Sequence, residues 1–312
     1  MGIAWALRLW LSGLLAATFA VYCSAIYAYS EPGKEPAYCT VFNHLVKSGG
    51  TTVKDQLTRA AKEENQDGPG VCSSDKMMYS DLCRHALQNS SVIMGYGELF
   101  RSSLVNTGRD CNYFTMMRHP VDRLVSAFFY CPNDHDVQHR PTELCGGIES
   151  DIPITTRLVQ YARMSWRNKA VTQMLYSVRC PEWGEDVCTV AEDRFEDLAP
   201  EFSLSKLLTT RGLQMMKFLE AQLEGYVAVG ISEEWELSMG LFDAVVESPV
   251  RRWDPELLRN SGNESKLRSK VLTWAHGSPE ISVIIAADIM LYDIAKEVFK
   301  KQTAKHLGMV WE

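Results

Sequence analysis

The stretch TVFNHLVKSGGTTVKDQLTRAAK, residues 40–62, decides the fold. Its start, Thr40 to Phe42, is a short apolar run of the kind that forms a buried strand. A glycine turn follows, and a helix is expected from about Thr51 to Lys62. A strand, a turn and a helix in this order predict an α/β fold with the turn at the carboxyl end of a strand.

The turn between this strand and this helix is suited to binding an anion. Helix N-termini favour negative charge, and glycines let a ligand approach the backbone closely. The residues of this anion loop are Lys47, Ser48, Gly49, Gly50, Thr51 and Thr52, which add one positive charge and three hydroxyls. Their spacing differs from GxxxxGK[ST], which disfavours a magnesium-dependent nucleoside triphosphatase. Taken alone, the hexad fits an ordinary turn with a threonine N-cap equally well.

A second motif, RHPVDRLVS at residues 118–126, follows the apolar run 113–117, which we predict to be another strand. It places the guanidinium of Arg118 at a strand end and the hydroxyl of Ser126 inside the next helix. Arg118 can hold a phosphate through two parallel hydrogen bonds, and Ser126 can donate to the same group. A solvated charge at the end of a strand is the alternative for Arg118. For Arg123 two interpretations stay open, a pair with a carboxylate or a role in the site.

Further elements repeat this alternation. Strands are expected at 91–94 and 226–229, and helices at 120–131, 153–163, 167–176, 204–223, 233–246 and 279–305, the last with one possible break. Residues 132–153 are polar and predict a long loop. Strands separated by helices predict a P-loop-like central parallel sheet flanked by helices.

The segment Leu9–Tyr29 contains no charged residue and is long enough for a transmembrane helix. Arg8 before it and Glu31 after it favour a cytoplasmic N-terminus, hence a type II membrane protein. The expected organisation is a cytoplasmic tip and transmembrane anchor (1–29), a short stem (30–38) and a lumenal domain (39–312). A cleaved signal peptide is the alternative, and it leads to the same compartment.

Eight of the nine cysteines lie beyond the apolar segment, as expected for disulfides formed in the secretory pathway. Proximity suggests the pairs Cys72–Cys83, Cys131–Cys145 and Cys180–Cys188, which leaves Cys39 with Cys111. Buried free thiols are the alternative. The sequence has no C-x-x-C motif and its seven histidines are scattered, so we expect no metal site. Two N-glycosylation sequons begin at Asn89 and Asn263.

The composition limits the class of partner. With 312 residues and 46% hydrophobic residues, the chain can bury a full core. Its net charge of −7 argues against a nucleic-acid partner held by bulk positive charge.

Taken together, the motifs resemble the Golgi carbohydrate sulfotransferases, especially the branch with heparan sulfate and uronyl 2-O-sulfotransferases. The likeness covers most of residues 40–300. It rests on FNHLVKSGGTT, FTMMRHPVDRLVSAFFY, RNKAVTQML (167–175), VGISEEWELSMGLF (229–242) and the ending ADIMLYDIAKEVF. The resemblance implies 3′-phosphoadenosine 5′-phosphosulfate as the sulfuryl donor, a glycan or proteoglycan acceptor and a place in the Golgi membrane.

The resemblance also implies roles for particular residues. Lys47 through Thr52 would hold the 5′-phosphosulfate, with Lys47 at the oxygen that bridges phosphorus and sulfur. Arg118 and Ser126 would hold the 3′-phosphate. Arg268 is a weaker candidate, because the stretch from Ser265 to Arg268 resembles a loop that closes over the nucleotide in relatives.

The sequence differs from the family pattern at the position where the general base is expected. Relatives of the 2-O-sulfotransferase type place histidines just after the second strand, where this chain has Met94 and Tyr96. Glu98 is the nearest proton acceptor and our first choice, with a solvated or helix-capping carboxylate as the alternative. His44 is the reserve candidate, although a structural role suits a histidine at the end of a buried strand.

Two other functions remain in view. The missing histidines motivate a catalytically inactive lumenal glycan-binding protein with a sulfotransferase fold. A phosphoryl-transferring kinase would use the same loop, but it needs a magnesium site that the sequence does not suggest.

Overall fold

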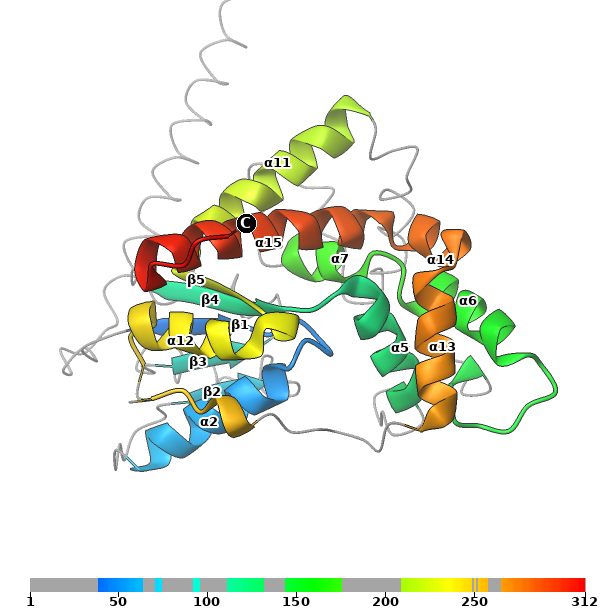
Figure 1. Cartoon of the computed structure of the whole chain (residues 1–312), viewed down its shortest axis with the longest axis horizontal. Helices are drawn as coiled ribbons and strands as arrows, with labels where there is room; N and C mark the ends of the chain where they lie inside the picture. The colour runs from blue at the N-terminus through cyan, green and yellow to red at the C-terminus, as the bar shows by residue number, and fades with distance from the viewer. Residues whose placement is uncertain are drawn as a thin grey trace, which may run out of the picture. The chain divides into compact units, whose positions relative to one another are not determined.

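The computed structural model describes residues 39–63, 71–74, 92–95, 111–131, 144–175, 209–248, 250, 252–257 and 265–311. Within them, five parallel strands form a sheet in the order β2-β3-β1-β4-β5. The strands are β1 (Thr40–Asn43), β2 (Val71–Ser74), β3 (Val92–Gly95), β4 (Asn112–Met117) and β5 (Ala228–Ile231). The predicted parallel sheet is therefore confirmed (Figure 1).

The strand order marks the edge where a ligand is expected. After β1 the chain moves to β2 and β3 on one side, and it then crosses β1 to reach β4 and β5 on the other. In open α/β sheets, ligands bind beyond the carboxyl ends of the strands where the order reverses. Here that point lies at the paired strands β1 and β4.

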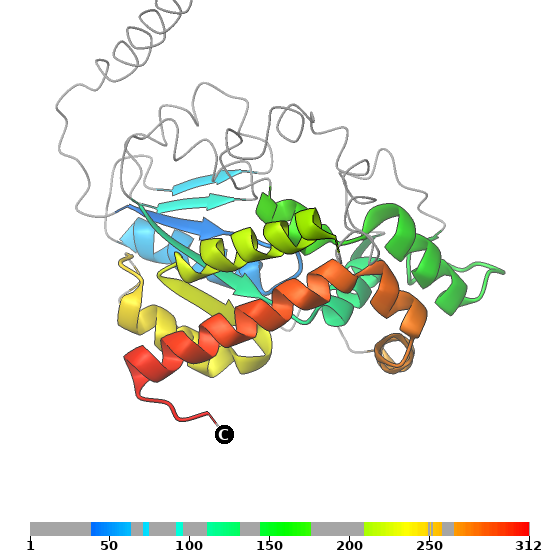
Figure 2. The same ribbon diagram turned by 90° about the horizontal axis from the view of Figure 1, so that it is seen from above.

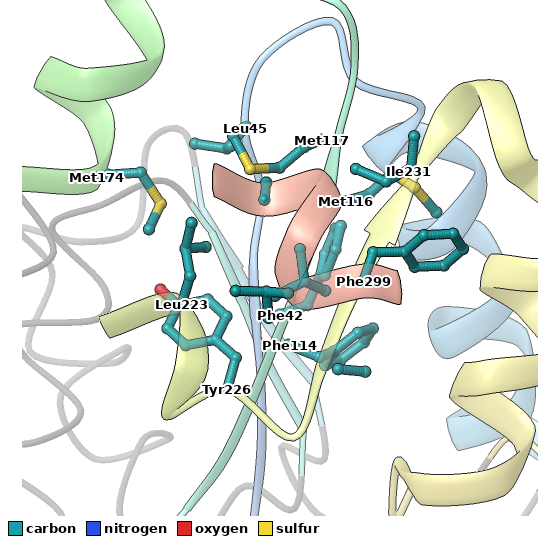
Figure 3. Close-up of a cluster of buried hydrophobic side chains, with 14 of the residues drawn as sticks. Phe42, Leu45, Phe114, Met116, Met117, Met174, Leu223, Tyr226, Ile231 and Phe299 are labelled. Atoms are coloured by element: carbon teal, nitrogen blue, oxygen red, sulfur yellow. The ribbon is translucent and has the colours of Figure 1, made fainter. Parts of the chain in front are cut away.

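Alternate residues of β1 and β4 face opposite layers of helices. Phe42 and Phe114 are paired across the strands, and the Phe114 ring lies 5.0 Å from Phe242 of α12 (Trp235–Val245). On the other face, Asn43 Nδ2 donates to Tyr226 Oη at 3.0 Å, directly after α11 (Thr210–Glu224). Figure 3 shows Phe42, Phe114 and Tyr226 within the resulting buried core.

The helix that follows the anion loop, α2 (Gly50–Glu63), lies beside α12, because Gln56 Nε2 approaches Met239 Sδ at 3.9 Å. The long C-terminal helix α15 (Ala286–Leu307) runs along β5 (Figure 2). Its Gln302 accepts a hydrogen bond from the Val229 amide at 2.8 Å and donates to the Tyr226 carbonyl at 2.9 Å. The C-terminal helix therefore holds the β5 segment through side-chain hydrogen bonds as well as by packing.

A second buried cluster lies to one side of the sheet and is mainly helical (Figure 1). It is formed by α5 (Pro120–Tyr130), α6 (Ile154–Ser165), α13 (Lys266–His276) and α14 (Pro279–Ile284). Leu124, Phe128 and Leu158 are fully buried in it. Two residues separate the end of β4 from the start of α5, so the cluster places α5 at the carboxyl edge of the sheet.

Two of the four expected disulfides are present, Cys39–Cys111 and Cys131–Cys145. The first joins the residues that precede β1 and β4, where the Asn112 amide also donates to the Cys39 carbonyl at 2.8 Å. The expected pairs Cys72–Cys83 and Cys180–Cys188, and both glycosylation sequons, involve positions outside the described residues.

Most predicted elements are confirmed, including a C-terminal helix that breaks once, at Ile285 between α14 and α15. The predicted strand 226–229 lies two residues too early, and β2 was not predicted. The expected loop around Arg268 is wrong, because Ser265 Oγ caps the helix α13 by accepting the Arg268 amide at 3.2 Å.

No helix in the described ranges is long and apolar enough to cross a bilayer. The apolar segment 9–29 lies outside these ranges, so the predicted anchor remains a prediction. All the described residues belong to one compact unit, Tyr38–Glu312.

Candidate functional site

The anion loop joins β1 to α2 and has an unusual backbone. Lys47 has a φ of 65° and Gly49 a φ of 82°, so both lie in the left-handed region. Glycine adopts this conformation freely, whereas for lysine a sparsely populated conformation costs on the order of 1–3 kcal/mol. Strain of this kind is concentrated at functional sites, so the backbone of Lys47 marks the loop as more than a connection.

Close packing explains why the loop has glycine at position 50. A Cβ on Gly50 would lie 1.9 Å from Cδ2 and 2.2 Å from Nε2 of His44. The His44 imidazole therefore lies directly against the backbone at the start of α2. A Cβ on Gly49 would lie 3.1 Å from the Trp235 ring. Side chains on both sides of the turn thus fix the path of its backbone.

The hydroxyls of the loop differ in exposure. Ser48 and Thr52 are buried, whereas Thr51 is exposed. Ser48 Oγ is fully buried and has no hydrogen-bond partner among the described residues. Burying a hydroxyl without a partner is costly, so this group is poised to donate to a ligand oxygen.

The side chain of Lys47 lies over an aromatic ring. Its Nζ is 3.7 Å from the centroid of Tyr130, at the end of α5. Tyr130 is 48% exposed, so the ammonium group lies near the surface of the protein. This contact brings the anion loop and α5, which are far apart in sequence, to one place.

The second motif lies at the same edge of the sheet. Arg118 directly follows β4, whose neighbour β1 runs into the anion loop. The Arg118 guanidinium is 4.0 Å from Asp122, and its side chain is 29% exposed. Asp122 and Ser126 are four residues apart in α5, so they share one face of that helix. Arg118 and Ser126 therefore belong to the same side of α5.

Arg123, for which two interpretations were open, pairs with a carboxylate. Its side chain is 1% exposed, and one terminal nitrogen lies 3.7 Å from Asp288. Its Nε donates to the carbonyl of Val46 at 3.0 Å, and its other terminal nitrogen donates to Gln173 at 3.1 Å. Because Val46 precedes Lys47, this buried cation holds the start of the anion loop.

Asp288 is the other half of this arrangement and was not recognised from the sequence. Its two oxygens accept the amides of Ala170 and Val171 at 3.0 and 2.9 Å, at the start of α7 (Lys169–Leu175). In return, Asn168 Oδ1 accepts the Ala287 amide at 3.1 Å, at the start of α15. Burial raises the pKa of Asp288, while Arg123 and the two amides oppose that rise.

His44, the reserve candidate for the general base, is buried. Burial and the positive charges of Lys54, Arg123 and Lys47 lower its pKa to about 3. Its ring stacks on Phe42, with centroids 5.8 Å apart, and packs against Gly50. These contacts favour a structural role for a neutral imidazole, but they do not test catalysis.

Glu98 and Arg268 are the two remaining candidates. Glu98 lies outside the described residues, so its assignment as the base stays a prediction. Arg268 lies in the first turn of α13, where its backbone amide donates to Ser265 Oγ at 3.2 Å. The candidate site therefore consists of the anion loop, Arg118 and Ser126.

A polar network next to Arg118 was also missed. The Asp122 carboxylate lies 3.3 Å from His119 Nδ1 and 3.0 Å from Nε2 of His276, the last residue of α13. Glu233 accepts the His119 amide at 2.9 Å and the Tyr292 hydroxyl at 3.0 Å. The sequence spacing suggested no such cluster, because its two histidines are more than 150 residues apart in sequence.

A family model described as the sulfotransferase family matches residues 35–197, just over half of the chain. The matched range contains the whole anion loop and the segment from Arg118 to Ser126. A search of curated proteins found no match.

Proposed function

The chain belongs to the sulfotransferase family, and from that premise we propose that it transfers a sulfuryl group from 3′-phosphoadenosine 5′-phosphosulfate to a glycan hydroxyl. The observation that carries this proposal is the pairing of β1 with β4. It supports two anion-binding groups at one edge of the sheet, the loop Lys47–Thr52 and the pair of Arg118 and Ser126. A donor with phosphate groups at both its 3′ and 5′ positions matches two such groups.

The residues of the anion loop fit a phosphosulfate. The buried hydroxyl of Ser48 can donate to it, and the N-terminus of α2 favours its charge. Gly50 lets the backbone at the start of α2 lie directly against the His44 ring, which fixes the path of the loop. Arg118, at the edge of the neighbouring strand, is part-exposed and can pair with the 3′-phosphate.

In the proposed reaction the sugar oxygen attacks sulfur in line with the departing oxygen. The bond between sulfur and the bridging phosphate oxygen breaks, and negative charge grows on that oxygen. Lys47 stabilises this charge from a fixed position, which is how electrostatic catalysis gains most of its effect. Its contact with Tyr130 supports this role, because the ring holds the ammonium group at the edge of the site.

The proton of the sugar hydroxyl passes to a general base, for which we propose Glu98. His44 is the weaker choice, since a pKa of about 3 makes the neutral imidazole a poor acceptor at physiological pH.

We further propose that the domain works in the Golgi lumen, anchored by residues 9–29 as a type II membrane protein. The disulfides Cys39–Cys111 and Cys131–Cys145 support an oxidising compartment. The acceptor is proposed to be a glycan or proteoglycan, by the resemblance of the sequence motifs.

A transfer assay tests the function. The purified full chain is incubated with sulfur-labelled donor and a panel of neutral and uronic glycans, and labelled glycan is measured. Lys47→Ala should lower turnover by about 10²–10³-fold, while Lys305→Ala, at the exposed end of α15, should not change it. Glu98→Gln should abolish most transfer, and His44→Ala should retain more activity than Glu98→Gln.

Other results would redirect the assignment. Donor binding without transfer to any glycan would favour the catalytically inactive glycan-binding protein. Transfer of phosphate instead of sulfate would favour the kinase. A fully active Glu98→Gln variant would exclude Glu98 as the base.

A further inference from the structure

We propose that His119, Asp122 and His276 form a binding site for one divalent transition-metal ion of the zinc class, adjacent to Arg118. We call these three residues the histidine–aspartate cluster. Each offers one ligand atom, and the three atoms lie within 4.8 Å of one another.

The distances suit a common centre. The Asp122 oxygen is 3.3 Å from His119 Nδ1 and 3.0 Å from His276 Nε2. Zinc bonds of about 2.0–2.1 Å at tetrahedral angles separate ligand atoms by about 3.3 Å. With small movements of the side chains, an ion can replace the contacts between Asp122 and the two imidazoles. It would also replace the hydrogen bond that His119 Nδ1 accepts from the Val121 amide at 3.3 Å.

The fold holds the ligands from two directions. His119 is the N-cap of α5 and Asp122 lies in its first turn, whereas His276 ends α13, which packs against α5. The two imidazole rings are 4.7 Å apart. Three ligands on two packed helices need little ordering when an ion binds.

A second layer of contacts fixes His119. Its backbone amide donates to Glu233, which also accepts the Tyr292 hydroxyl, and its ring lies 5.3 Å from the Tyr292 ring. These contacts hold the backbone and the ring of His119 in place, so that less ordering is needed when an ion binds. The Glu233 carboxylate adds a negative charge beside His119, which favours a cation at the cluster.

The donor atoms select the class of ion. Two imidazoles and one carboxylate suit zinc and its neighbours, whereas magnesium and calcium prefer oxygen ligands. The side chain of His276 is 42% exposed, so solvent can supply a fourth ligand.

The position of the cluster suggests what the ion does, and this step rests on the proposed function. Asp122 lies 4.0 Å from Arg118 and partly cancels its charge. A bound cation would neutralise Asp122 and make this edge of the sheet more attractive to a 3′-phosphate. By reciprocity, a bound nucleotide would tighten the binding of the metal by the same factor.

Titration calorimetry with zinc chloride tests the site on the purified full chain at a pH held constant at about 7.5, because metal affinity depends on pH. Wild type should bind one equivalent that weakens at least tenfold in His276→Ala and Asp122→Asn. The control His306→Ala, which changes an exposed histidine near the end of α15, should bind like wild type. Circular dichroism confirms that each variant is folded. The absence of saturable binding, or equal binding in wild type and His276→Ala, would overturn the site.

A second titration separates the site from its coupling. Zinc should tighten the binding of adenosine 3′,5′-bisphosphate several-fold in wild type and His306→Ala, but not in His276→Ala. Zinc binding with an unchanged nucleotide affinity would overturn the coupling alone. Zinc binding by a chain that does not bind the nucleotide would contradict the proposed function and leave the metal site standing.

Discussion

The Arg123 guanidinium lies 3.7 Å from the Asp288 carboxylate, and both side chains are only 1% exposed. Arg123 comes from the helix after β4 and Asp288 from the C-terminal helix α15. Between them they hold the carbonyl of Val46 and the first turn of α7. The pair thus connects the start of the anion loop to the helices that cover the sheet.

Arg123→Met should lower the free energy of unfolding by about 3–5 kcal/mol, because it leaves the buried Asp288 without its cation. Arg163→Met is the matched control. It breaks a 2.6 Å pair with Glu280 whose partners are 62% and 49% exposed, and such pairs contribute about 1 kcal/mol or less. Denaturant unfolding measures both. Equal losses of unfolding free energy in the two variants would mean that the buried pair stabilises the protein no more than the exposed pair does.

Gly50→Ala should destabilise the protein by about 1–3 kcal/mol, because its Cβ would overlap the His44 ring. The same change in a His44→Ala background should cost much less, since the obstructing ring is absent. Gly240→Ala in α12 is the control, because its nearest neighbour would lie 3.7 Å away. Thermal unfolding compares wild type with the Gly50→Ala, His44→Ala and Gly240→Ala variants and with the double variant. Additive losses in the double variant would show that His44 does not fix the loop.

Because the pKa of His44 is lowered to about 3, the folded protein should become less stable as the pH falls. Between pH 6.5 and 3 the unfolded chain binds a proton at this residue while the folded chain does not. Stability should therefore fall by up to about 1.4 kcal/mol for each pH unit in that window, beyond the effect of other groups. His44→Gln should lose this part of the slope between pH 6.5 and 4. Equal slopes of the free energy of unfolding against pH in variant and wild type would contradict the prediction.

The two disulfides should differ in their contribution. They close segments of 72 and 14 residues, Cys39–Cys111 and Cys131–Cys145 respectively. Loop-closure entropy alone gives about 4.4 and 3 kcal/mol. Replacing each pair by alanine and measuring the free energy of unfolding should therefore show a larger loss for Cys39–Cys111. A larger loss for Cys131–Cys145 would show that native packing outweighs chain entropy here.

Sequence patterns predicted the sheet and most helices because these depend on local periodicity. Proximity in the sequence predicted Cys131–Cys145, whereas Cys39–Cys111 was predicted only as the pair that remained. Strand β2 was not predicted because Val71–Ser74 contains only two apolar residues and lacks a clear alternation of apolar and polar residues. Helix α13 was not predicted because the residues from Lys266 to Lys270 are mostly polar and exposed, so no apolar stripe marks its start.

The parts of the site that depend on long-range contacts could not be predicted. Asp288 lies on the apolar stripe of its helix, and a carboxylate at such a position signals a buried partner, but nothing local identifies Arg123. His276 meets Asp122 only because α13 packs on α5. The anion loop was recognisable because its glycines, lysine and hydroxyls are contiguous.

The central claim is that the ends of β1 and β4 bind the 5′ and 3′ phosphates of one nucleotide. Calorimetry on the purified full chain should compare adenosine 3′,5′-bisphosphate with AMP, for wild type and Arg118→Ala. The bisphosphate should bind about 10- to 100-fold more tightly to wild type, the value of a charged hydrogen-bonded pair, and Arg118→Ala should remove most of that preference. Equal affinities for the two nucleotides in wild type would contradict the account.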